Sequence, residues 1–379
     1  MKKRLISLIG LFYFISLWGQ QDSCSHCGGA LMRRDTGLYV YGPLVRKVSL
    51  NLVGGFLMPH HEDMIQMYHH ISSAQLRITK NFSQSKTGVS LKAHQHLGYF
   101  IGYYNLGSSI SGKGIAAGIN FNSVITGSRS KHQLYFDYVF GLGYLTETYD
   151  PYKNPENRAI GSHLNGYVQF GVGYDYLITN QISMGMNLAL SHFSNASWKF
   201  PNLGINLPSA GIHIKYQYQT HKKLNPVKLP KLVIGHHQTV SFRMGHKEFD
   251  FDDNRGFTMA MCEYQYETKL TLQSNLRFGI SAFYDPTYGF QKFKPLPSYS
   301  VKNTTELGVS VGYESKFGRW GILTDLGIYV YKPKMSAKKP YYEGIGLRYY
   351  IDSKWSAIVR LKANGTVADF AEFGVALKL

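Results

Sequence analysis

The feature that most constrains this chain is an alternation of apolar and polar residues with a period of two. In DFAEFGVALKL, at residues 369–379, Phe373 and Val375 share one parity, whereas Glu372 and Lys378 share the other. Successive side chains of a β-strand point to opposite faces, so each such segment predicts a strand with one apolar and one polar face. After the amino-terminal apolar stretch, no segment reaches the roughly 18 consecutive apolar residues of a transmembrane helix. The chain is therefore expected to be all-β.

Alternation of this kind recurs in about sixteen segments, with about twelve as the lower bound. An even number of strands, each apolar on one face and polar on the other, is typical of bacterial outer-membrane barrels. The 29 Tyr, 22 Phe and 39 Gly residues suit such strands. We therefore expect an antiparallel transmembrane outer-membrane β-barrel with long outer loops. The approximate strand centres are Leu52, Arg77, Phe100, Ala117, Phe136, Phe170, Met186, Ile214, Val240, Met261, Phe278, Val309, Leu326, Leu347, Val359 and Val375.

The amino terminus has the pattern of a secretory signal. Residues 1–20, MKKRLISLIGLFYFISLWGQ, combine a basic start with an apolar stretch of about 14 residues, which is short for a membrane span. The protein is therefore expected to be exported to the bacterial outer membrane. Residues 21–45 form a tail in which Cys24 and Cys27 favour a local disulfide or no function, because two ligands are half a metal site. No metal or cofactor is expected.

The segment THKKLNPVKLPK is too long and too rich in Pro and Lys for a periplasmic turn. It divides residues 46–220 from residues 221–379, whose strands complete or extend the barrel. The pattern leaves open whether the strands close as one barrel or as two unequal parts.

The formal charge of +18 indicates an anionic partner. Nucleic acid is disfavoured, because an exported strand-rich chain carries no recognised binding module. Contact with lipopolysaccharide phosphates in the outer leaflet, or a solvated lumen, explains the surplus of Lys and Arg most simply. Three histidine pairs invite a metal interpretation, but adjacent strand residues point to opposite faces and no HExxH motif is present. The pairs are His60–His61, His69–His70 and His236–His237.

The stretch LSHFSNASWKFPNLGIN, residues 190–206, follows an apolar strand. His192 and Ser194 share the parity of Met186, so we expect them to face lipid near the outer end of the strand. Side chains two residues apart lie about 7 Å apart at the backbone. A histidine beside a serine is a base beside a nucleophile, and Asn195 is a candidate oxyanion donor. A lone His-x-Ser pair is also interpretable as ordinary interfacial residues.

The same stretch resembles the His-x-Ser-Asn motif, followed by Pro-Asn-x-Gly, of the outer-membrane lipid A 3-O-deacylases (the PagL family). It resembles more closely the longer bacterial proteins labelled acyloxyacyl hydrolase. The resemblance covers roughly residues 50–218. It implies hydrolysis of an ester-linked acyl chain of lipid A, with His192 and Ser194 in catalysis and Asn195, Asn202 and Gly204 around the oxyanion and substrate. Asn206 is added to the catalytic residues by its position, and His163 to the substrate-binding residues by its place on the preceding loop.

One position departs from the family pattern. Asn206 stands where the best-known members carry a glutamate that orients the histidine. An amide can accept a hydrogen bond from imidazole, but it does not stabilise imidazolium as a carboxylate does. His163 and Asp150, on the preceding outer loop, are the candidates to supply the missing charge.

The sequence therefore predicts an outer-membrane serine esterase acting on lipid A or lipopolysaccharide. The chief alternative is a non-enzymatic transport or structural barrel in which Arg348, Arg360 and Lys362 select solutes in a polar lumen. A third is a soluble periplasmic β-sandwich, which would extract without detergent. The acyl position and the oligomeric state do not follow from the sequence.

Overall fold

The computed structural model describes residues 32–34, 37–40, 44–81, 95–126, 130–220, 227–228, 235–271, 273–290, 300–334, 336, 338–365 and 367–379. The expected signal peptide and the pair Cys24 and Cys27 lie outside the described residues. Among those described, no helix is long and apolar enough to cross a membrane.

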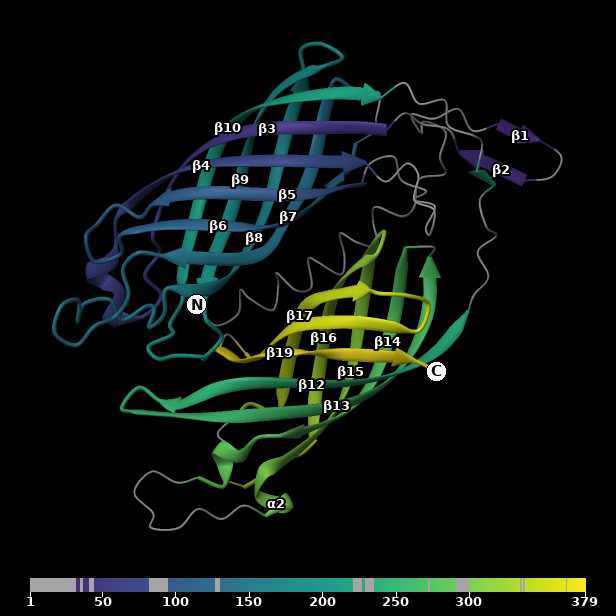
Figure 1. Ribbon diagram of the computed structural model, residues 1–379. Coiled ribbons are helices and arrows are strands. Elements are labelled where there is room, and N and C mark those ends of the chain that lie inside the picture. Colours follow the sequence, from purple (N-terminus) through teal and green to yellow (C-terminus); the bar gives the residue numbers. More distant parts are fainter. Residues whose placement is uncertain are drawn as a thin grey trace.

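Two closed antiparallel barrels of eight strands each form the molecule (Figure 1). The first barrel contains β3 (Leu44–Phe56), β4 (His70–Asn81), β5 (Gln95–Asn105), β6 (Lys113–Val124), β7 (His132–Leu145), β8 (Leu164–Leu177), β9 (Ile182–Ser194) and β10 (Ile205–Thr220). The second contains β12 (His236–Asp250), β13 (Asp253–Thr271), β14 (Ser274–Tyr284), β15 (Thr305–Phe317), β16 (Trp320–Tyr331), β17 (Tyr341–Tyr350), β18 (Trp355–Asn364) and β19 (Val367–Lys378).

A few short elements lie outside the barrels. β1 (Met32–Arg34), β2 (Gly37–Val40) and β11 (Val227–Lys228) form a separate three-stranded sheet. The connections carry η1 (Glu62–Met67), η2 (Pro286–Tyr288) and α2 (Val301–Thr304).

The prediction of an all-β antiparallel barrel protein is confirmed, because every expected strand centre lies in one of these barrel strands. The sequence left open whether the strands close as one barrel or as two unequal parts, and the structure has two closed barrels of eight strands each. β10 pairs with β3 from Ser209↔Gly55 to Thr220↔Leu44, so the first eight strands leave no free edge for later strands. β12 and β19 close the second barrel in the same way. The β-sandwich alternative is wrong, because both sheets close.

Side chains alternate across the barrel walls. In β9, Met184, Met186 and Leu188 are exposed on the outer wall, whereas Asn187 and Ser191 are buried inside. The outer wall of the second barrel is apolar too, with Phe242 and Ile280 among its exposed residues. An apolar outer band around a polar interior is the organisation of a transmembrane barrel.

The first barrel is filled differently at its two ends. The loops after β3, β5, β7 and β9 lie at one end, called here the loop end. Below them is an apolar cluster that includes Leu57, Met64, Ile160 and Phe193, all fully buried. The rest of the interior is polar and contains a cavity of about 30 Å³. The apolar cluster therefore anchors the loops that follow the strands.

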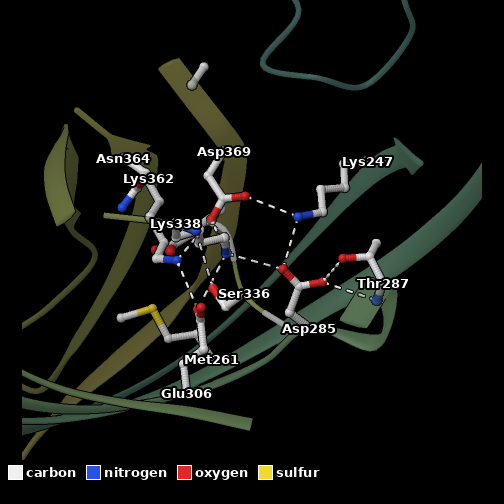
Figure 2. Close-up of polar contacts among 12 residues, drawn as sticks. Lys247, Met261, Asp285, Thr287, Glu306, Ser336, Lys338, Lys362, Asn364 and Asp369 are labelled. Carbon is white, nitrogen blue, oxygen red and sulfur yellow. Dashed lines mark hydrogen bonds and ion pairs between the residues drawn. The ribbon is translucent and has the colours of Figure 1, made fainter. Parts of the chain in front are cut away.

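The second barrel is filled by charged side chains. Arg360 contacts Asp325 at 3.0 Å and Glu372 at 2.9 Å, and Arg348 contacts Glu267 at 2.9 Å. Towards the end of the second barrel that carries η2, Lys247, Lys338 and Lys362 are paired with Asp285, Glu306 and Asp369 (Figure 2). Buried charges are tolerated where they are paired, so this network forms the core of the barrel.

The barrels touch at two levels. Apolar residues of the two outer walls pack together, with the rings of Phe121 and Phe317 centred 5.0 Å apart. At the loop end, Glu248 of β12 accepts a hydrogen bond from the backbone of Phe200, on the loop after β9, at 2.7 Å. The second barrel therefore contacts the loop that follows the predicted catalytic strand.

Candidate functional site

His192 and Ser194 lie at the loop end of β9, on its outer wall. Their partly buried side chains continue the parity of Met184, Met186 and Leu188. Between them, Phe193 points inward, is fully buried and packs against Tyr167 with ring centroids 4.9 Å apart. Because strand neighbours point to opposite faces, the buried ring fixes the outward direction of the residues on either side.

The imidazole of His192 is held by the residue opposite it on β10. His192 and Asn206 are register partners, and His192 Nδ1 lies 2.7 Å from Asn206 Oδ1. The amide nitrogen of Asn206 in turn lies 3.1 Å from Nδ1 of His60, on the loop after β3. Nε2 of His60 lies 2.9 Å from the carbonyl oxygen of Leu203. A row of hydrogen bonds therefore runs from His192 to a backbone carbonyl.

The hydroxyl of Ser194 contacts the loop that follows β9. Its Oγ donates to Asn202 Oδ1 at 3.1 Å and accepts from the backbone N–H of Ala196 at 3.2 Å. No hydrogen bond joins Ser194 to His192 among the described contacts of these two residues. The structure therefore brings the imidazole and the hydroxyl to one face of β9, with the hydroxyl turned towards Asn202.

The two asparagines of the loop have different hydrogen-bonding roles. Asn195 Nδ2 donates to Ser162 Oγ at 2.9 Å and to the carbonyl oxygen of Lys199 at 2.7 Å, which commits both of its N–H groups. Asn202 Oδ1 accepts from Ser194 and from the backbone of Asn195, at 3.0 Å in the latter case. Asn202 is therefore the residue that links the serine to the loop.

Gly204 lies against the histidine. Its φ of 79° is in the left-handed region that favours glycine, and an added Cβ would lie 2.6 Å from Cε1 of His192. Both observations explain why this position, next to the imidazole, requires glycine.

His163 and Asp150 lie apart from this group. His163 Nδ1 donates to the carbonyl oxygen of Leu145 at 2.7 Å. Asp150 Oδ1 accepts from the backbone amides of Tyr152 and Lys153, both at 2.8 Å, and these bonds hold the pKa of Asp150 below its ordinary value. Both residues line a separate cavity between the loops after β5 and β7. In the described chain, neither residue is hydrogen-bonded to His192, whose ring nitrogen Nδ1 is paired with Asn206.

Sequence reasoning did not assign His60 to the site. No spacing rule signals it, because it lies 146 residues before Asn206 on a different loop. Within the described residues, no group of three or more His, Cys, Asp or Glu side chains is placed to hold a metal ion.

The apolar outer walls and the two closed barrels define an outer-membrane β-barrel protein. At one rim, its outer wall carries a histidine and a serine. Residues 71–217 match the family model described as lipid A 3-O-deacylase (PagL). Residues 233–379 match the model described as acyloxyacyl hydrolase, C-terminal domain. One match falls on each barrel, and the resemblance to this family inferred from the sequence is confirmed.

Solved structures give a coarser likeness. Neisserial surface protein A is 8% identical, covers 46% of this chain and 97% of its own, and has a TM-score of 0.33. The outer-membrane enzyme PagL is 20% identical, covers 45% and 98%, and has a TM-score of 0.31. A mutant of the Rh. blastica porin is 8% identical, covers 89% and 99%, and has a TM-score of 0.17. No curated protein matches the chain.

Proposed function

We propose that the first barrel is a serine esterase that hydrolyses an ester-linked acyl chain of lipid A in the outer leaflet of the outer membrane. The observation that carries the proposal is the emergence of His192 and Ser194 together from the apolar outer wall, at the loop end of β9. The ester bonds of lipid A lie where the sugar headgroup meets the acyl chains. A site at the rim of an apolar band is at that level, with Met186 and Leu188 beside the acyl layer.

The proposed reaction begins with a rotation of the Ser194 side chain from Asn202 towards His192. Nε2 of His192 takes the hydroxyl proton as Oγ attacks the ester carbonyl carbon. The proton then passes to the alcohol oxygen of the ester as its C–O bond breaks, which leaves an acyl group on Ser194. Water, deprotonated by the same nitrogen, attacks the acyl-serine and releases the fatty acid and the free serine. Atoms and protons balance over the two steps.

Asn202 is the proposed oxyanion donor. When Ser194 turns away, Oδ1 of Asn202 keeps its hydrogen bond to the backbone of Asn195, which holds the amide in place. Its Nδ2 group then has N–H bonds available for the developing negative charge on the substrate. Asn195 has both side-chain N–H groups committed, so its proposed role is to hold the loop.

Asn206 gives this site a neutral orienting group. Its Oδ1 holds the imidazole of His192 at 2.7 Å. Cysteine proteases with a Cys-His-Asn arrangement use an amide in the same position of the triad. Stabilisation of imidazolium is weaker than with a carboxylate, so the proposed enzyme relies on orientation.

The experiment is acyl release by the purified protein in detergent, with lipopolysaccharide as the substrate and free fatty acids measured by mass spectrometry. Ser194→Ala is expected to abolish release. Ser183→Ala is the matched control, because Ser183 lies on the same strand but on the inner face and away from the site. Equal release by wild type and Ser194→Ala would overturn the proposal.

The transport alternative needs cations that are free to meet solutes. Arg348 and Arg360 are each 1% exposed and are paired with Glu267 and Glu372. Acidic partners neutralise their charge in the interior of the barrel, and this pairing favours a structural role for both arginines.

A further inference from the structure

We propose that His60 is a positioning residue that selects the orientation of the Asn206 amide and, through it, the tautomer of His192. The inference rests on the proposed function. It starts from the carbonyl oxygen of Leu203, which can only accept a hydrogen bond. Because this oxygen lies 2.9 Å from His60 Nε2, the proton of a neutral His60 is on Nε2. Nδ1 of His60 lies 3.5 Å from the carbonyl oxygen of Met58, but the shorter contact at Nε2 decides where the proton lies. Nδ1 is then a bare acceptor.

The next link is the amide of Asn206. A bare Nδ1 at 3.1 Å requires a donor, so Asn206 turns its NH₂ group to His60. Its Oδ1 therefore faces Nδ1 of His192, 2.7 Å away, and can only accept. The proton of neutral His192 is then on Nδ1, and Nε2 carries the lone pair that removes the serine proton. One backbone carbonyl thus sets the protonation pattern of the base.

An amide needs such a device because its two ends are nearly the same size and opposite in hydrogen-bonding sense. If Asn206 turned over, its NH₂ group would donate to Nδ1 of His192. The histidine proton would move to Nε2, and the base would have no lone pair for Ser194. A carboxylate at position 206 has two accepting oxygens and no wrong orientation. The requirement for His60 therefore follows from having an amide at this position.

The test is a double-mutant cycle with purified protein and lipopolysaccharide. His60→Ala is expected to lower kcat with little change in KM, by less than the ~10⁴-fold loss that a fully wrong tautomer causes. Asn206→Asp is expected to remain active, and the same His60→Ala substitution is expected to have little effect in that background. His61→Ala is the matched control, because His61 caps η1 and contacts Asp63. An equal loss from His60→Ala in both backgrounds would overturn the inference.

A second readout does not depend on activity. In protein labelled with ¹⁵N-histidine, the nitrogen shifts distinguish a bare from a protonated ring nitrogen. His192 is expected to show a bare Nε2 in the wild type and a mixture of tautomers in His60→Ala. An unchanged His192 signal in His60→Ala would overturn the inference, whatever the activity of Asn206→Asp. If Ser194→Ala released fatty acid normally, the proposed function would fail while this measurement still tested the hydrogen-bond row.

A separate set of contacts concerns the second barrel. Glu248 Oε2 accepts from the backbone of Phe200 at 2.7 Å, and the backbone of Glu248 donates to the carbonyl oxygen of Ser197 at 3.0 Å. Ser197 Oγ donates to the carbonyl oxygen of Ala368 at 3.3 Å, and Trp198 packs against His246. The loop 195–204 is therefore tied to two elements of the second barrel.

We infer that the second barrel acts as a clamp that holds this loop, and with it Asn202, against Ser194. The bonds at Phe200 and Ser197 lie within five residues of Asn202 along the loop. A loop tied at these points has fewer conformations in which Asn202 leaves the serine. This gives the charged second barrel a role in the proposed reaction without placing any of its residues in contact with the substrate.

Glu248 offers the test, because glutamine keeps an accepting oxygen and alanine does not. Glu248→Ala is expected to lower kcat for acyl release several-fold with little change in KM, and Glu248→Gln is expected to retain most of it. Heat-dependent gel mobility establishes that both variants fold. Glu62→Ala, at an exposed position of η1, is the control. Wild-type kcat in Glu248→Ala, or equal loss in both Glu248 variants, would overturn the clamp.

Discussion

His192 and Asn206 are directly opposite each other on β9 and β10, and the 2.7 Å bond between them lies on the outer wall of the barrel. Close cross-strand partners are held by the sheet itself, so the sheet fixes the position of the imidazole beside Asn206. The same sheet register places Ser194 two residues along, on the same face. His192, Ser194 and Asn206 therefore lie on a rigid wall, whereas Asn202 and His60 are supplied by loops.

Removal of the base is predicted to affect chemistry alone. His192→Gln is expected to lower kcat for acyl release by about 10⁴-fold or more, as loss of a triad base does in serine hydrolases. His163→Gln is the control, because His163 hydrogen-bonds to Leu145 and not to the site. Steady-state kinetics with lipopolysaccharide measure both. A small effect of His192→Gln, or an equal effect of His163→Gln, would move the base elsewhere.

Substitution of Gly204 is predicted to displace the imidazole. Gly204→Ala places a Cβ 2.6 Å from Cε1 of His192 at a backbone φ of 79°, so both strain and overlap act against the native geometry. We expect a loss of most activity with the barrel still folded. Gly54→Ala, where an added Cβ meets nothing within 4 Å, is expected to be neutral. Normal activity in Gly204→Ala would mean that the position of His192 is not critical.

Substitution of Asn202 by Asp tests the hydrogen-bond donor of its side chain separately from the acceptor. Asn202→Asp keeps an oxygen for the backbone N–H of Asn195 but removes the proposed oxyanion donor. The expected loss in kcat is about 10²–10³-fold, the usual effect of one oxyanion donor. Asn195→Asp is expected to act mainly through thermal stability, because its side chain holds the loop. The reverse pattern, with Asn195 controlling kcat, would assign the oxyanion to Asn195.

The second barrel is predicted to lose stability at both extremes of pH. Burial raises the pKa of Asp285, but the ammonium groups of Lys247 and Lys338 outweigh burial and hold it below the ordinary 3.8. Burial lowers the pKa of Lys338, but the carboxylates around it, Asp369 first, raise it well above 10.5. The carboxylate therefore stabilises above pH 3.8 and loses this effect as the pH falls through its lowered pKa.

Lys338 makes the stability of the second barrel depend on pH at the alkaline end. Its contribution is complete below pH 10.5 and is lost as the pH rises through its raised pKa. The unfolding temperature of the detergent-solubilised protein is expected to change little between these limits and to fall outside them. Asp285→Asn is expected to lower the plateau and to reduce the fall on the acid side. A steep fall at neutral pH would contradict this origin of stability.

Much of the fold could be predicted because each barrel strand repeats one local pattern. The parity of Met186 carried directly to His192 and Ser194, and the outward direction of both followed from it. Closure could not be predicted in this way. Whether β10 pairs with β3 or with a later strand depends on hydrogen bonds between backbones, and these leave no mark in the side-chain pattern.

The candidate site was predictable where its contacts are local. His192, Ser194 and Asn202 lie within one short stretch, whereas His60 reaches Asn206 from a loop 146 residues away. The expectation that His163 or Asp150 replaces a missing charge relied on their shared outer loop. In the structure, backbone groups near each residue occupy their side chains instead. Competition of this kind depends on loop geometry, which composition does not reveal.

The most direct measurement is mass spectrometry of lipid A from cells that produce either the wild-type protein or Ser194→Ala, matched for folded protein in the outer membrane. The account predicts that wild-type cells contain lipid A lighter by one ester-linked acyl chain and that the variant leaves lipid A intact. The same lipid A profile in both strains would contradict it.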